Sequence, residues 1–484
     1  MLNQELKHKA TKGFLWNTIE KFSNTIAQFF VGIILARLLE PEDFGLIGII
    51  TFFTVISQVF IDSGMGSGLI QKQNRTKEDF STVFIFNIVI SLSCYGLLFL
   101  SAPWIAAYYE KPELVLLTRV IGLSLIINSL NVVQRTKLEI DVDFKKLAKV
   151  NVFSLVLGGA LGIGGAFLGF GVWSLVIQVL TISLATTLGF WLIGSWSLSL
   201  KFSKESFRSL FSYGSKLLVA GVYAKTLHEV YNLVIGKAYS MGELGYFTQA
   251  KKLGDISIGV ITSVAQKVSF PILSSLQNDR DKMISMYSKM IRMSAFISFP
   301  VMILLAILAE PIIIILLGEK WIPVIPLFRW LCFARLVYPI NMINMNILNA
   351  NGRSDLFLKV DLIKLPIIVI ALIITIPLGL EAIVIGQTVT SIMSFFINAY
   401  LPKKLFGYGA FDQLFDMKGT IFSALVMSAS VFLLLVFVEN IYIQLALGLI
   451  TGALVFLSVA QFIKLYELIQ LKSIIKSYMS NLRK

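Results

Sequence analysis

The sequence predicts an all-α polytopic membrane protein with about 14 transmembrane helices. Composition is the first reason, because 56% of the 484 residues are hydrophobic and only 14% are charged. Soluble domains are nearer a quarter charged. Apolar segments of about 20 residues, the length that crosses a hydrocarbon core, recur along the chain. The basic residues between these segments are unevenly distributed, as expected when alternate loops face the cytoplasm.

Fourteen segments are long and apolar enough to be spans. Their approximate cores are 14–39, 44–70, 80–102, 114–133, 148–168, 172–194, 211–238, 244–272, 290–317, 325–348, 356–377, 382–401, 420–438 and 442–463. Loops and chain ends on one side of this arrangement hold 28 lysines and arginines, and those on the other side hold four. Because cytoplasmic loops are enriched in these residues, we expect both termini in the cytoplasm.

An internal repeat groups the first twelve spans into two sets of six. Residues 37–45 connect spans one and two, and the similar residues 237–245 connect spans seven and eight. Asn131 and Asn341 also correspond, in spans four and ten. Six is an even number, so the two halves have the same orientation, related by an axis along the membrane normal. The expected domains are an N-lobe at 1–200, a C-lobe at 201–405, two further spans at 406–463 and a basic amphipathic cytoplasmic tail at 464–484.

The seventh span is unusually polar for a membrane helix. Lys225, His228 and Asn232 follow the spacing i, i+3, i+7, so they share one helix face. A charge in hydrocarbon costs several kcal/mol, so these side chains should face other protein or a wet cavity. Two interpretations remain open. Lys225 and Glu229 are at i, i+4 and could neutralise each other. Alternatively, the cations form a site for an anionic cargo, to which Lys216 at the cytoplasmic end would contribute.

The eighth span also carries an excess of basic residues, since Asp255 alone does not balance their charge. Lys251 and Lys252 are adjacent and point about 100° apart, so at most one faces inward. We include Lys252 with Lys216, Lys225 and His228 as the predicted substrate-binding set.

Acidic residues inside spans form a second predicted set. Asp62, four residues after Gln58 in span two, is typical of a proton or cation site, although it could simply be hydrated near the cytoplasmic end. Glu229 and Asp255 are predicted for the same ion-coupling role. No metal site is expected, because two cysteines and two histidines show no ligand spacing.

Span one carries a polar stripe with helical spacing. Asn17, Asn24 and Gln28 lie on it, and Asn232 of span seven is similar in kind. Amides both donate and accept hydrogen bonds, so these residues are predicted to line a polar cavity. Alternatively, these side chains form hydrogen bonds between helices, and the sequence favours neither role.

Four short stretches resemble signatures of the Wzx-type polysaccharide flippases, which belong to the multidrug/oligosaccharidyl-lipid/polysaccharide exporter superfamily. They are Leu-Ala-Arg-Leu-Leu at 35–39, Pro-Glu-Asp-Phe-Gly at 41–45, Leu-Asn-Ala-Asn-Gly-Arg at 348–353 and Gly-Leu-Glu-Ala at 379–382. The resemblance implies two six-helix lobes around a central cavity lined by spans one, two, seven and eight. It also implies alternating-access transport of polyprenyl-pyrophosphate-linked oligosaccharide across the bacterial cytoplasmic (inner) membrane, for lipopolysaccharide or exopolysaccharide biosynthesis.

The expected partners are therefore this lipid-linked oligosaccharide, membrane lipids, and a glycan polymerase with its export machinery, without nucleic acid or cofactor. A lipid II flippase or a multidrug antiporter of the same fold is the alternative. The excess of cations in spans seven and eight favours anionic cargo over cationic drugs. A membrane enzyme is disfavoured, because the outer loops are short and the single intramembrane histidine, His228, has no evident nucleophile or metal partner. No catalytic residue is predicted.

Overall fold

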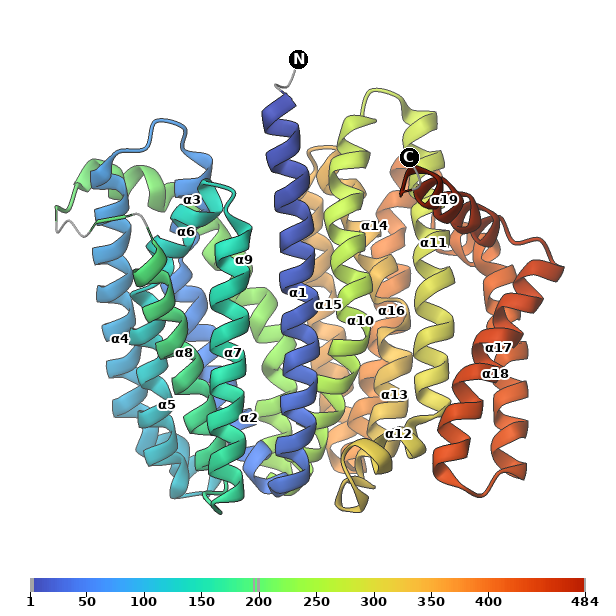
Figure 1. Cartoon of the computed structure of the whole chain (residues 1–484), viewed down its shortest axis with the longest axis horizontal. Coiled ribbons are helices and arrows are strands. Elements are labelled where there is room, and N and C mark those ends of the chain that lie inside the picture. Colours follow the sequence, from blue (N-terminus) through green and yellow to red (C-terminus); the bar gives the residue numbers. More distant parts are fainter. Residues whose placement is uncertain (1–3, 195, 198–200, 483–484) are drawn as a thin grey trace. The chain divides into compact units, whose positions relative to one another are not determined.

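The computed structural model describes residues 4–194, 196–197 and 201–482, and no strand occurs among them (Figure 1). The α-helices are α1 (Gln4–Leu38), α2 (Pro41–Asp62), α3 (Met65–Gln71), α4 (Lys77–Tyr109), α5 (Glu113–Ser129), α6 (Val132–Ile140), α7 (Phe144–Phe167), α8 (Trp173–Ile193), α9 (Lys204–Ala238), α10 (Met241–Ser275), α11 (Arg280–Ile307), α12 (Ala309–Leu316), α13 (Val324–Leu336), α14 (Tyr338–Ala350), α15 (Ser354–Thr375), α16 (Leu380–Phe406), α17 (Ala410–Phe437), α18 (Ile441–Phe462) and α19 (Tyr466–Leu482). Two short 3-10 helices are η1 (Glu319–Trp321) and η2 (Ile376–Leu378).

Twelve helical segments in the described part of the chain are long and apolar enough to cross a membrane. The prediction of an all-α polytopic membrane protein is thus confirmed. The two expected spans outside this group are α1 and α9, which are 35 residues each and are the polar first helices of the two repeats. At 1.5 Å per residue each is about 52 Å long, so length does not exclude them. Their polarity keeps both helices out of this apolar group, so the number of 14 spans stays a prediction.

Four expected spans are interrupted in the structure, and in span nine α11 ends at Ile307 and α12 begins at Ala309. Span two ends as α2 and restarts as α3, because Ser63 and Gly64 adopt left-handed backbone conformations, with φ of 42° and 67°. Span four breaks at Asn131, which directly precedes α6. Span ten breaks before Pro339 in the first turn of α14, where proline has no N–H to continue the helix.

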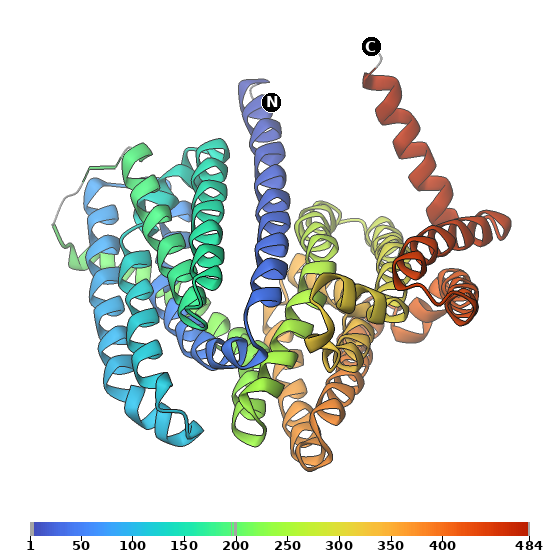
Figure 2. The ribbon, with the colours of Figure 1, turned by 60° about the horizontal axis from the view of Figure 1, so that its bottom comes forward.

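The first compact unit is Met1–Thr248. Within it α4 packs on α5, α5 on α8 and α8 on α7, and these helices run side by side in two views (Figures 1 and 2). Small residues permit the closest approaches. A Cβ on Gly158 or Gly162 of α7 would lie against α8, and one on Gly159 would lie 2.6 Å from Val31 of α1. The glycines of α7 therefore set the spacing to both neighbours.

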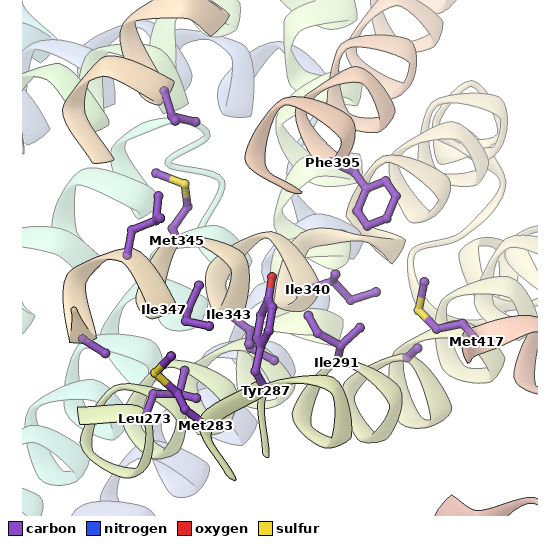
Figure 3. Packing of buried hydrophobic residues seen from close by; sticks show 14 of the residues in the cluster. Leu273, Met283, Tyr287, Ile291, Ile340, Ile343, Met345, Ile347, Phe395 and Met417 are labelled. Carbon is purple, nitrogen blue, oxygen red and sulfur yellow. The ribbon is translucent and has the colours of Figure 1, made fainter. Parts of the chain in front are cut away.

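The second compact unit is Gln249–Lys484. Its main core joins α11, α14 and α17, and Figure 3 shows Tyr287 of α11 reaching toward α14 beside Ile340 and Ile343. The Tyr287 hydroxyl donates to Asn344 Oδ1 at 2.6 Å and accepts from Gln413 Nε2 at 3.0 Å. Gln413 also bonds Asn344, which closes a buried triangle of polar groups. This triangle ties α17, the helix after the second repeat, into the core of the unit.

The C-terminal tail forms the helix α19, as its amphipathic pattern suggests, and it runs obliquely to α17 and α18 (Figure 1). Glu467 is buried and pairs with Arg292 of α11 at 3.5 Å. The guanidinium of Arg292 also lies 5.2 Å from the ring centroid of Tyr466. The start of the tail is therefore held on α11 by charge as well as by apolar contact. The boundaries of the two lobes and the tail, drawn from the repeat, stay predictions.

Candidate functional site

The polar helix α9 packs antiparallel on α2 through glycines. The contacting pairs are Gly214 with Gly64, Gly221 with Val59 and Gly236 with Ile49. Because 22 residues (236 − 214) separate the outermost glycines, the seam is about 33 Å long, close to the thickness of a hydrocarbon core. Lys225 lies midway, 11 residues from each end (225 − 214 and 236 − 225). Lys225 therefore lies at the middle of the seam between α9 and α2.

The two predicted lysines of α9 differ from Lys237 at its end, which pairs with Glu110 at 3.2 Å. Lys216 and Lys225 are exposed, and neither forms a salt bridge within the residues that the structure describes. Glu229 is buried and does not pair with Lys225. It accepts a bond from Asn232 Nδ2 at 2.8 Å and lies 2.7 Å from His228 Nδ1. Lys225 and Glu229 form no salt bridge in the described part of the chain, so the interpretation of a neutral Lys225–Glu229 pair is not supported.

The predicted residues of α10 behave differently from one another. Lys252 is exposed and makes no salt bridge in the described ranges, whereas Lys251 is 7% exposed. Asp255 pairs with Arg335 Nε at 2.7 Å. Arg335 is itself buried and lies against Gly254, where a Cβ would be 3.2 Å from the Arg335 side chain. The partner of Asp255 thus comes from α13, which sequence spacing did not suggest.

Asp62 lies at the end of α2 and accepts a hydrogen bond from Gln58 at 3.0 Å. It is within electrostatic range of Arg135, Glu139 and Lys225. Asp62 and Lys225, predicted for separate roles, are therefore neighbours on the packed pair α2–α9. Arg135 and Glu139 were absent from the predicted set, because hydropathy assigned them to a cytoplasmic loop. In the structure they belong to the short helix α6, which follows the break in span four.

The polar stripe of α1 is only partly described, and the side chain of Asn17 lies outside the described residues. Asn24 is half-buried and its Oδ1 has no hydrogen-bond partner among the described residues, while Gln28 is exposed. Glu20, which lies beside the stripe, accepts a bond from Asn151 Nδ2 of α7 at 2.5 Å. A polar neighbour of the stripe therefore serves helix contact, and the Oδ1 of Asn24 is an unused acceptor within the described residues.

The two repeated loops of the sequence meet reciprocally in the first unit. A Cβ on Gly45 would overlap the backbone carbonyl of Met241, and a Cβ on Gly245 would overlap that of Pro41. The four positions are related by the same offset of 200 residues, so the contact has approximate two-fold symmetry. Only glycine allows two backbones to approach this closely. At the same end of α2, the hydrogen bond from Lys111 to Glu42 raises the pKa of that lysine.

The sequence is similar to a known protein family and to several known proteins. The profile of the family described as polysaccharide biosynthesis protein matches residues 34–326. The chain belongs to this family. The teichuronic acid biosynthesis protein TuaB of Bacillus subtilis (strain 168) is 26% identical over 347 residues, which cover 71% of this chain and 72% of TuaB. The lipopolysaccharide biosynthesis protein WzxC of Escherichia coli (strain K12) is 21% identical over 402 residues, covering 82% and 80%.

A solved structure has the same fold. The lipid II flippase MurJ in an inward closed conformation superposes with a TM-score of 0.76, covering 93% of this chain and 98% of that one at 16% sequence identity. At this identity the likeness concerns the fold alone. The family match and the shared fold agree with the resemblance to Wzx-type polysaccharide flippases. The roles of individual site residues stay predictions.

Proposed function

We propose that this member of the polysaccharide biosynthesis family flips a polyprenyl-pyrophosphate-linked oligosaccharide from the inner to the outer leaflet of the bacterial cytoplasmic membrane, with both termini in the cytoplasm. Family membership supports the polysaccharide, and a multi-pass helical structure supports transport rather than chemistry. The single observation that carries the cargo is the set of exposed lysines without salt bridges, Lys216 and Lys225 on α9 and Lys252 on α10.

The lysines suit a diphosphate for an energetic reason. A diphosphate entering a membrane protein loses water, and charge-assisted hydrogen bonds offset that loss where the cations are not already neutralised. A lysine held by a carboxylate would have to give up its own partner first. Lys225 is free of this cost, since Glu229 is occupied by His228 and Asn232. Lys216 and Lys225 are nine residues apart (225 − 216), about 13.5 Å along the helix, so they lie at successive depths.

The polar residues have complementary proposed roles. Asn24, Gln28 and Asn232 offer amide groups to sugar hydroxyls, and His228 orients Glu229 beside the path. Asp62 is the best candidate for ion coupling, because Gln58 is the one hydrogen-bond partner of its carboxylate in the described ranges and the opposing charges of Arg135 and Lys225 lie near. Asp255 is already neutralised by Arg335. A glycan polymerase would act on the delivered product at the outer surface.

Alanine substitution of the lysines tests the cargo. In Lys225→Ala and Lys252→Ala, surface glycan should fall and lipid-linked oligosaccharide should accumulate in the inner leaflet, at unchanged protein level. A charge-assisted hydrogen bond contributes about 1.5–3 kcal/mol, so cargo affinity should fall about tenfold or more. Lys282→Ala is the matched control, because that side chain is 75% exposed and pairs with a neighbour in a connecting turn.

Wild-type glycan in both variants would contradict the cationic site. Accumulation of lipid II in a deletion strain, in place of the oligosaccharide precursor, would select the alternative cargo.

A further inference from the structure

The first compact unit contains a cavity of about 490 Å³ that none of the predicted roles explains. It lies among α2, α3, α5, α6, α7 and α8, with Asp62 at one wall and Asn151 at another. Its volume is within the range of small-molecule sites, 300–1,000 Å³. At the density of liquid water it would hold roughly 16 waters, which is ample for a pyranose ring.

The lining of this cavity is polar. Of its 17 residues, 11 carry side chains that form hydrogen bonds. A groove between α10 and α11 in the second unit is the opposite, since Ser269 and Ser294 are the two polar side chains among the 11 residues that line it. Polar lining is therefore not a general property of hollows in this protein. A lipid chain suits the groove, and a hydrophilic ligand suits the cavity.

Several polar groups in the cavity have no protein partner. The side chains of Asn128, Ser183 and Thr186 make no hydrogen bond within the described residues. Gln58 donates to Asp62, and Arg135 pairs with Glu139 at 3.0 Å, each with donors or acceptors left over. Asn128 and Thr186 are half-buried, so their polar groups are open to water or to a ligand with many hydroxyls.

The charges of the cavity exclude other cargo groups. Asp62 and Glu139 are two carboxylates against one guanidinium, that of Arg135. A diphosphate would meet net negative charge here, so the cavity does not suit the charged head of the cargo. Neutral sugars avoid this repulsion, because carboxylates accept from hydroxyls, amides both donate and accept, and the guanidinium donates. Lys225 lies near Asp62 at the wall of the cavity. It could therefore contact the diphosphate of the same lipid while the cavity holds the sugar next to that diphosphate.

We propose that this cavity, defined by Gln58, Asp62, Asn128, Arg135, Ser183 and Thr186, binds the diphosphate-proximal sugar of the cargo. The cavity is a carbohydrate subsite inside the first unit, separate from the lysines that hold the diphosphate. It rests on the proposed flippase function. It also gives the protein a means of accepting glycosylated polyprenyl diphosphate in preference to the bare lipid, which shares the same diphosphate.

Binding of two lipids to the full chain in nanodiscs tests the proposal. The probes are polyprenyl diphosphate and the same lipid carrying the oligosaccharide extracted from a deletion strain. Wild-type protein should bind the glycosylated lipid more tightly. Thr186→Val and Asn128→Leu keep the size of the side chain and remove its hydrogen bonding. Each should lower the affinity for the glycosylated lipid about fivefold, which is the ratio for one neutral hydrogen bond. The affinity for the bare lipid should not change. Ser294→Ala, in the apolar groove, is the control.

Three other results would overturn either the sugar subsite or the proposed function. Thr186→Val and Asn128→Leu that keep the full preference for the glycosylated lipid overturn the sugar subsite but leave the flippase proposal intact. An equal loss of affinity for both lipids in these variants also overturns the sugar subsite, because the defect is then structural. A wild-type protein that binds neither lipid overturns the proposed function itself.

Discussion

Gly45→Ala would place a methyl group where α2 touches the first turn of α10. The atoms nearest to the new carbon are the carbonyl oxygen of Met241, its carbonyl carbon at 2.8 Å and its Cα at 3.2 Å. All are backbone atoms, so no side-chain rotation relieves the overlap. The substitution therefore forces α2 and α10 apart at this point.

The size of the effect follows from the geometry. Carbon atoms attract best at about 3.5–4.0 Å, so 2.8 Å lies deep in the repulsive range. Overpacking of this kind costs about 1–3 kcal/mol where neighbours cannot yield. The cost applies only to a conformation in which the two helices touch, so the balance shifts toward one in which they are apart. For about 2 kcal/mol the shift is roughly thirtyfold.

Cysteine accessibility measures this shift. Ile235 on α9 is fully buried near the contact, and Ile235→Cys in a background without Cys94 and Cys332 provides the probe. A membrane-impermeant maleimide added outside should label it up to about thirtyfold faster in Gly45→Ala, and likewise in Gly245→Ala. Gly96→Ala is the control, because nothing lies within 4 Å of a Cβ there. Identical labelling rates in Gly45→Ala and Gly96→Ala, with unchanged melting temperature, would refute the reasoning.

Two further predictions concern buried polar contacts in the second unit. Tyr287→Phe removes a hydroxyl that bonds both Asn344 and Gln413, so it should destabilise by about 1–3 kcal/mol in a thermal melt, while Tyr400→Phe, whose side chain is 67% exposed, should not. Asp255→Asn leaves the buried Arg335 without its counter-charge and should cost about 2 kcal/mol, less than a fully buried pair because Asp255 is 38% exposed. Adding Arg335→Gln should recover most of that loss, and a double variant as unstable as the sum of the two single variants would disprove the coupling.

Hydropathy and the repeat predicted the fold because both record long-range regularities of the chain. Each helix had to be long and apolar, and each lobe had to present the same loops. The breaks were missed because a window of about 20 residues averages over them. Gly64 allows a close approach, since a Cβ there would lie 2.7 Å from the carbonyl oxygen of Gly214. That it also turns the backbone at φ 67° was not visible in composition.

The site could be predicted only where its residues share a helix. Lys225, His228 and Asn232 were found together because helical spacing relates them. The spacing left the partner of Glu229 open, and the structure places the adjacent His228 at 2.7 Å from it. Asp255 and Arg335 are 80 residues apart, and no local pattern connects them. Contacts made by tertiary packing lie beyond any spacing rule.

Polarity explains why α1 and α9 fall outside the group of sufficiently apolar spans. A helix surrounded by lipid gains from every apolar residue, so selection for insertion alone would remove Lys216, Lys225 and His228. Their presence indicates that α9 has a polar environment along one face. The same reasoning applies to α1, where the Oδ1 of Asn24 has no hydrogen-bond partner in the described part of the chain. The first helix of each repeat thus gives up apolar surface, as the proposed passage of a hydrophilic cargo requires, and the polar cavity beside Asp62 lies in the same unit as both helices.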